Sequence, residues 1–137
     1  MNSPTDLKAV LVIAIRVVNI GLTLLFVLAM AVQFNDPDPL LWVTIYGLVV
    51  VVAGLAVFSK YYIPLILILL VICAAGSLYL MPSVFELFAR HDAGDIMAKM
   101  APDRPYIEEA RESLGLLIAA IALAYFYVLA RKSRRVR

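Results

Sequence analysis

The sequence predicts an all-α integral membrane protein: a bundle of four transmembrane helices, with a short amphipathic interfacial helix between spans 3 and 4. Three observations indicate this fold class. Hydrophobic residues make up 64% of the 137-residue chain, and its mean hydropathy is +0.96. These residues gather in four stretches, each close to the roughly 20 residues that a helix needs to cross a bilayer. None of the stretches alternates apolar and polar residues, so the strands of a membrane barrel are not indicated.

The four expected spans form a single transmembrane domain over residues 1–137. They cover about residues 10–33, 40–58, 62–81 and 106–130. Short connections join the first three spans, which favours antiparallel packing of neighbouring helices.

The first span has an alternative interpretation as a secretory signal. Lys8 and Arg16 could form the basic region of a signal peptide, and Ala29-Met30-Ala31 resembles a cleavage site. The whole apolar stretch, about residues 10–33, is longer than the roughly 7–15 residues usual in a signal peptide. We therefore expect an uncleaved first span.

The second span follows the turn Asn35-Asp36-Pro37-Asp38-Pro39. Asp38 is suited to the N-cap of this span, and Pro39 to its first helical position. Trp42 lies one turn further on, where interfacial aromatic residues are common. In the third span, Cys73 is the single cysteine of the chain and has the character of a small buried packing residue.

The connection 82–105 before the fourth span is the longest in the chain. Ser83 and Glu86 have the spacing of a capping box, and the apolar residues 84, 85, 87 and 88 have Glu86 and residues 90–92 as polar partners. This pattern predicts a short amphipathic helix on the membrane surface. In that position the connection could cover the outer mouth of the bundle. Pro105 is suited to the first turn of the fourth helix.

The charges divide sharply between the two sides of a four-span topology. Eight of the twelve Lys and Arg residues fall on the side of the termini: Lys8, Arg16, Lys60, Arg131, Lys132, Arg134, Arg135 and Arg137. Nine of the ten acidic residues fall on the other side. The positive-inside rule therefore predicts a multi-pass protein of the cell membrane with both termini cytoplasmic. The basic C-terminal tail is suited to anionic lipid, and nucleic-acid binding is not indicated.

Asn35, Asp36 and Asp38 form the first candidate site, at the outer end of the first span. Carboxylate and amide oxygens gathered in a turn suit a hard cation or the basic group of a partner. The alternative is structural, because Asn, Asp and Pro are also preferred in tight turns and helix caps.

The second candidate site opens the fourth span, at the same membrane face. Glu108, Arg111, Glu112 and Gly115 share one helical face, and Glu109 lies one turn from Glu112. Acidic residues in a first turn also favour the helix dipole, which is the structural alternative. An ion pair of Arg111 with an aspartate of the first turn would likewise be structural. Glu112 borders the uninterrupted apolar stretch, so we expect it to face the bundle interior.

Together these residues form the expected acidic polar cluster. The candidates for ligand or partner binding are Asn35, Asp36, Asp38, Trp42, Glu109, Arg111 and Glu112. The candidate ligands of a divalent cation are Asp36, Asp38, Glu109 and Glu112.

Several other kinds of site are excluded. His91 is the only histidine, so the chain alone can supply neither two axial haem ligands nor a histidine-rich zinc site. The sequence has no P-loop and no dinucleotide-binding motif. No nucleophile elbow surrounds a serine, which argues against a hydrolase triad with His91.

Two segments carry a resemblance to a known family. The first segment is Val32-Gln33-Phe34-Asn35-Asp36-Pro37-Asp38, followed by Trp42 and Tyr46. The second is Glu108-Glu109-Ala110-Arg111-Glu112, followed by Gly115. These segments resemble the two hallmark motifs of the transmembrane protein 220 family. The family consists of small multi-span membrane proteins without an established activity. The resemblance implies that both motifs belong to one shared feature. The family's motif positions carried over to this chain are Gln33, Asn35, Asp36, Pro37, Asp38, Trp42, Tyr46, Glu108, Glu109, Arg111, Glu112 and Gly115.

Three functions remain open at this point. The first is a non-catalytic binding or accessory module. It would use the expected acidic polar cluster at its extracytoplasmic face to bind a partner membrane protein, a lipid headgroup or a cation. The second is a membrane enzyme that uses the same carboxylates for metal binding or acid–base chemistry. The third, a transporter, would need a polar path through the bundle, whereas the span centres are nearly free of charge.

Overall fold

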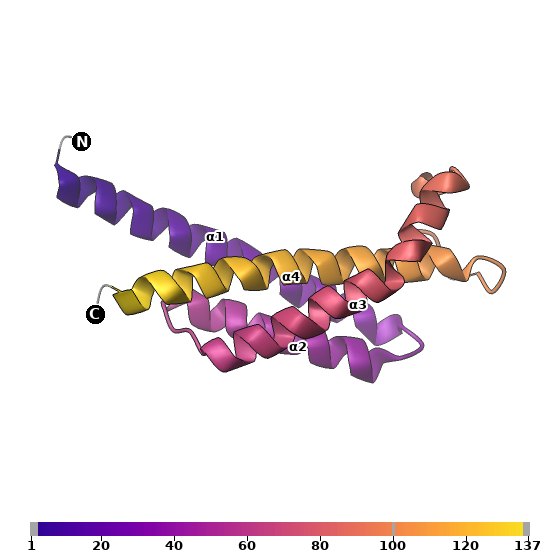
Figure 1. Cartoon of the computed structure of the whole chain (residues 1–137), viewed down its shortest axis with the longest axis horizontal. Coiled ribbons are helices and arrows are strands. Elements are labelled where there is room, and N and C mark those ends of the chain that lie inside the picture. The colour runs from indigo at the N-terminus through magenta and orange to yellow at the C-terminus, as the bar shows by residue number, and fades with distance from the viewer. Residues whose placement is uncertain (1–2, 100, 136–137) are drawn as a thin grey trace.

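The computed structural model describes residues 3–99 and 101–135. Its long elements are helices that alternate in direction, so that the start of α1 and the end of α4 lie at the same end of the bundle (Figure 1). Arg137 and the outermost residues of the predicted domain lie outside the described residues. The elements are α1 (Pro4–Val32), η1 (Gln33–Asn35), α2 (Pro39–Val57), α3 (Ile63–Ala89), η2 (Ala93–Asp95) and α4 (Pro105–Arg135).

Four of these helices are long and apolar enough to cross a membrane. The prediction of an all-α, multi-pass bundle is therefore confirmed. α1, α3 and α4 extend beyond their expected spans, whereas α2 closely matches its expected span. At the start of α1, the Ser3 side chain accepts hydrogen bonds from the backbone N–H groups of Thr5 and Asp6.

The third helix continues through Pro82 to Ala89. The amphipathic segment between spans 3 and 4 is helical, as predicted, but it is continuous with α3, and the expected cap at Ser83 does not start a new helix. Proline lacks an N–H, and its ring crowds the carbonyl of residue 78, so the helix bends there. Beyond the bend, α3 turns away from the bundle axis (Figure 1).

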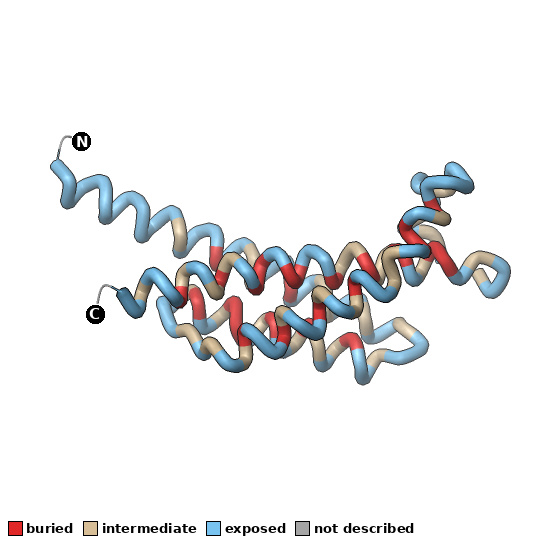
Figure 2. The backbone as a smooth tube through the Cα atoms, in the orientation of Figure 1, coloured by how far each residue is buried: buried red, intermediate tan, exposed pale blue. Residues whose placement is uncertain are grey.

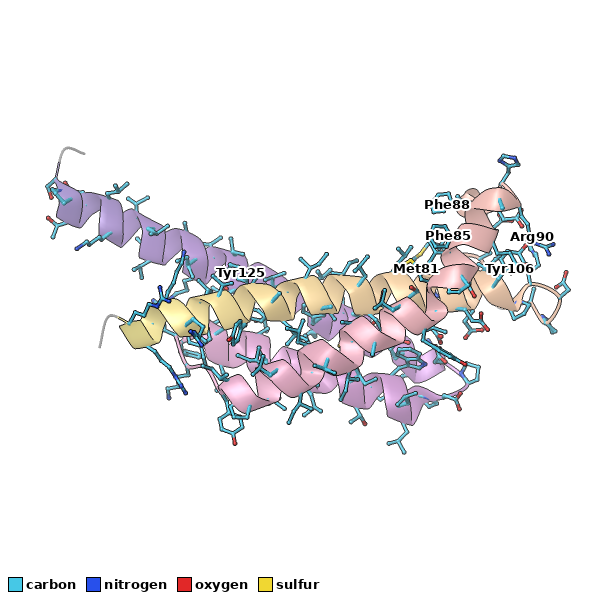
Figure 3. All side chains as sticks on the ribbon, viewed as in Figure 1. Met81, Phe85, Phe88, Arg90, Tyr106 and Tyr125 are labelled. Atoms are coloured by element: carbon cyan, nitrogen blue, oxygen red, sulfur yellow. The ribbon has the colours of Figure 1, made fainter. Side chains whose placement is uncertain are left out.

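The bent end of α3 has one buried and one exposed side. Val84 and Leu87 are buried against the start of α4. Phe85 and Phe88 are exposed on the side of this segment opposite Arg90, as Figure 3 shows. Arg90 reaches back over the Tyr106 ring, with its guanidinium carbon 5.0 Å from the ring centre. This polarity matches the amphipathic character expected for a segment at a membrane surface.

The main core lies where α2, α3 and α4 meet. Val49, Ala53, Cys73, Leu123 and Phe126 are all at most 1% exposed there. Cys73 is thus a buried packing residue, as predicted.

Small residues allow α3 and α4 to approach closely. A Cβ atom on Gly76 would lie 2.8 Å from Cδ1 of Leu116 on α4. One turn away, the Ser113 hydroxyl donates a hydrogen bond of 2.8 Å to the Ser77 carbonyl. Both features are typical of helix pairs in membranes, where close packing and interhelical hydrogen bonds replace the hydrophobic effect.

The first helix is the least packed of the four. It contacts α2, and only Asn19 and Phe26 along its length are buried. Its N-terminal half diverges from the other helices and is exposed except at the half-buried Ile15, as Figures 1 and 2 show. A gap therefore separates α1 from α4 at the end of the bundle where α1 begins and α4 ends.

Candidate functional site

The α1–α2 turn forms as its sequence requires. The Asp36 backbone N–H donates to the Gln33 carbonyl at 3.1 Å, which closes the η1 turn. The Asp36 carboxylate accepts a hydrogen bond of 3.4 Å from the Asp38 backbone N–H. Pro39 then begins α2, whose N-cap, Asp38, makes no capping bond with its side chain. The turn thereby holds the Asp36 carboxylate beside α4.

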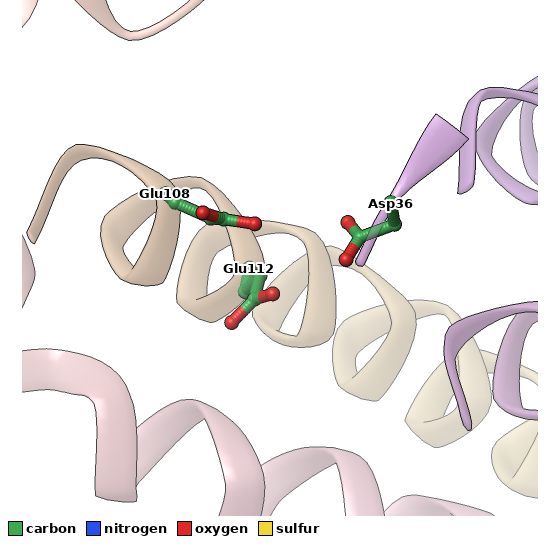
Figure 4. A group of neighbouring side chains, drawn as sticks. All are labelled: Asp36, Glu108 and Glu112. Carbon is green, nitrogen blue, oxygen red and sulfur yellow. The ribbon is translucent and has the colours of Figure 1, made fainter. Parts of the chain in front are cut away.

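Two glutamates of α4 meet this carboxylate. Glu108 and Glu112 are four residues apart, so they lie on one face of the helix. One carboxylate oxygen from each of Asp36, Glu108 and Glu112 lies within 4.8 Å of the other two, and all three residues are half-buried. Figure 4 shows the two glutamates of α4 with Asp36 next to them. We call these three residues the acidic cluster.

The acidic cluster concentrates negative charge. At 4.8 Å, two unit charges repel by about 1 kcal/mol in water and by about 3 kcal/mol at an effective dielectric constant of about 20. Among the described residues, the ion pairs are Glu86 with Arg90 and Asp95 with Arg104, and neither involves the cluster. Protons or an external cation would offset this repulsion.

Among the described residues, Arg111 forms no ion pair with the acidic cluster. Its guanidinium lies 3.5 Å from the carbonyl oxygens of Ile96 and Ala98 and donates to both. The alternative in which Arg111 pairs with Asp36 or Asp38 is therefore wrong. The two carbonyls draw the guanidinium toward the connection before α4, so that Arg111 ties this connection to the helix.

An aromatic stack lies beneath the acidic cluster. Tyr46 is 4% exposed, and its ring centre lies 6.5 Å from those of both Phe26 and Trp42. Trp42 is itself only 8% exposed, so it is a packing residue of the bundle in addition to lying near the interface. The Tyr46 hydroxyl occupies the space that a Cβ on Gly115 would need.

The two sequence motifs therefore meet at two points. Asp36 of the first motif lies beside Glu108 and Glu112 of the second, and Tyr46 of the first fits against Gly115 of the second. The implication that the motifs form one feature agrees with this arrangement.

The structure brings together some of the predicted site residues and separates others. Asp36 and Glu112 converge, whereas Asn35 and Asp38 are exposed in the turn. Glu109 is directed to α3 and accepts a hydrogen bond from the Ser83 hydroxyl. Glu108 takes the third position of the cluster. The spacing of four residues between Glu108 and Glu112 was the signal that could have identified it.

The chemistry of the cluster is that of a hard-cation site. Three carboxylate oxygens can supply part of the six to eight oxygen ligands that Ca²⁺ takes, or part of the octahedron around Mg²⁺. Water or oxygen atoms of a partner would complete either shell.

Comparison with known proteins yields one match. The family model described as transmembrane family 220, helix, matches residues 25–128, which include both motifs and the five residues at which they meet. No curated protein and no solved structure matches the chain. Because the matched range covers most of the chain, the protein belongs to transmembrane family 220.

Proposed function

We propose that the protein is a non-catalytic membrane module that binds a cation at its acidic cluster. The observation that carries this proposal is the convergence of Asp36, Glu108 and Glu112 without a basic partner among the described side chains. The ligand is a divalent metal ion, or else the basic group of a partner membrane protein or lipid headgroup. Either ligand removes the mutual repulsion of the carboxylates.

The proposed location follows from the charge distribution. The end of the bundle with both termini carries most of the basic residues, so we place it in the cytoplasm of a cell membrane. The acidic cluster then faces the extracytoplasmic side, where divalent cations and partner ectodomains are accessible to it.

An enzyme is the second candidate, and the same convergence favours it. Two or more carboxylates within reach of one cation could activate a bound water. A transporter has less support, because Asn19, Ser77, Ser83 and Ser113 are the buried polar residues of the described chain and none is charged.

Cation binding can be tested through thermal stability. The detergent-purified chain is heated with Ca²⁺, Mg²⁺, Mn²⁺ or a chelator, and wild type is compared with Asp36→Asn, Glu108→Gln and Glu112→Gln. A ligand at a hundred times its Kd stabilises the native state by about 2.7 kcal/mol. We expect a cation-specific rise in Tm that all three variants lose.

Asp38→Asn and Glu109→Gln are the matched controls. They remove the same charge from neighbouring residues outside the acidic cluster, so they should retain the response. A response that is absent in wild type, or equal in the cluster variants and the controls, would refute metal binding.

A further inference from the structure

The gap between α1 and α4 contains a cavity at the end of the bundle opposite the acidic cluster. Its volume is about 470 Å³, and it is bounded by α1, the α2–α3 turn and the end of α4. Leu11 and Ile15 contribute apolar walls, while Arg16, Tyr61 and Lys132 contribute polar groups. It exists because the N-terminal half of α1 diverges from the bundle (Figure 1).

One polar side chain in this cavity wall lacks a hydrogen-bond partner. Asn19 is 0% exposed, and its Nδ2 donates a hydrogen bond of 2.9 Å to the Ala56 carbonyl. This bond determines the orientation of the amide. Its Oδ1 has no partner among the described residues. A buried acceptor without a donor is unfavourable, and more so in a membrane, where water is scarce.

The polar end of the cavity is basic. A neighbouring cavity of about 350 Å³ shares Ser59, Tyr61 and Ser133 with the first and adds Lys60 and Arg134. Within residues 3–99 and 101–135, no acidic side chain lines either cavity. Burial, and to a lesser extent the neighbouring Tyr125, raises the pKa of Tyr61 above its usual value, although the adjacent Asn19 side chain lowers it in part. Its hydroxyl therefore remains a proton donor at neutral pH and suits an anion.

A separate apolar hollow lies between α1 and α4 further toward the middle of the bundle. Its volume is about 360 Å³, it shares no lining residue with the first cavity, and Val18, Leu22 and Ile121 are among its walls. The order along α1 is thus a cation at Arg16, an unpaired acceptor one turn deeper at Asn19, and an apolar hollow beyond. This order matches an amphiphile with an anionic head, a hydrogen-bond donor below it and a single hydrocarbon chain.

We propose that this gap binds an anionic lysophospholipid. Arg16 and Lys132 hold its phosphate, Asn19 Oδ1 accepts a hydrogen bond from its free glycerol hydroxyl, and its one acyl chain lies between α1 and α4. A diacyl phospholipid offers only ester oxygens at that depth, and these cannot donate to Oδ1. The site shares no residue with the acidic cluster and is independent of the proposed function.

Native mass spectrometry of the detergent-purified full chain tests this assignment. Lysophosphatidic acid with one oleoyl chain is titrated beside dioleoyl phosphatidic acid and neutral monooleoylglycerol. We expect one lysophosphatidic acid to bind per chain. It should bind about tenfold or more tighter than either competitor, because the neutral lipid lacks the charge-assisted hydrogen bonds of the phosphate and the diacyl lipid lacks the buried hydrogen bond to Asn19. Equal binding of the diacyl lipid or of the neutral lipid would overturn the proposal.

Variants separate the roles of the three residues. Arg16→Gln and Lys132→Gln change exposed side chains and should each weaken binding of lysophosphatidic acid about tenfold. Arg131→Gln removes the same charge from a neighbouring residue that lines neither cavity, so it should bind like wild type. Asn19→Ala should remove the preference for the lysolipid over the diacyl lipid. Unchanged binding in Arg16→Gln and Lys132→Gln, or an unchanged preference in a folded Asn19→Ala protein, would overturn the proposal.

Discussion

Gly115→Ala should loosen the contact that joins the two motifs. The new Cβ would overlap the Tyr46 hydroxyl, while the adjacent ring carbon Cζ would remain at an ordinary 3.5 Å. Tyr46 is buried between Phe26 and Trp42, so it has little room to move. Overpacking of this kind costs about 1–3 kcal/mol. The substitution also gains up to about 1 kcal/mol in helix propensity, so its net destabilisation is smaller.

A second glycine separates the two contributions. A Cβ on Gly54 meets nothing within 4 Å, so Gly54→Ala should show only the gain in helix propensity. We therefore expect Gly115→Ala to be less stable than Gly54→Ala by about 1–3 kcal/mol. Tyr46→Phe removes the overlapping oxygen, so the double variant Tyr46→Phe/Gly115→Ala should recover most of that difference.

The assay is unfolding of the purified protein in mixed micelles of increasing SDS content. Trp42 is the only tryptophan and stacks on Tyr46, so its fluorescence reports on this contact. Equal stabilities of Gly115→Ala and Gly54→Ala would refute the reasoning. Failure of Tyr46→Phe to rescue Gly115→Ala would refute it as well.

Three further substitutions have measurable consequences. Without added cation, Glu112→Gln should stabilise the protein by about 1–3 kcal/mol because it relieves repulsion in the acidic cluster, whereas Glu109→Gln weakens the bond from Ser83 and should not stabilise it. Ser113→Ala removes a buried interhelical hydrogen bond and should cost about 0.6–1.7 kcal/mol; no loss of stability would show that the bond contributes nothing. Pro82→Ala should straighten α3, which electron paramagnetic resonance would detect as a longer distance between labels on either side of residue 82; an unchanged distance would assign the bend to packing.

Much of this architecture follows from the sequence alone. Four stretches of bilayer length determine the number of membrane helices, because every backbone polar group in lipid must be bonded within its own helix. The Asn, Asp and Pro residues of the 35–39 turn determine where α1 ends and α2 begins, because these residues are suited to turns and helix starts. Even the pairing of the two motifs could be inferred, since both fall at the same end of the bundle.

Tertiary packing decided which side chains meet. Asp36, Asp38, Glu108, Glu109 and Glu112 are equivalent by composition and by topology. The rotation of α4 about its axis brings Glu108 and Glu112 to Asp36 and turns Glu109 toward Ser83 on α3. That rotation is set by close contacts such as Gly76 with Leu116, and such contacts depend on atoms far apart in the chain.

The divergence of α1 from the bundle also depends on tertiary packing and could not be predicted from the sequence. By hydropathy α1 is as good a span as the others, yet only Asn19 and Phe26 on it are buried. In lipid, an apolar helix face gains no hydrophobic free energy by leaving the hydrocarbon, so its sequence cannot specify that it packs against α4. Shape and hydrogen bonding decide instead, and here they leave Asn19 bonded to α2 and a gap on its other side.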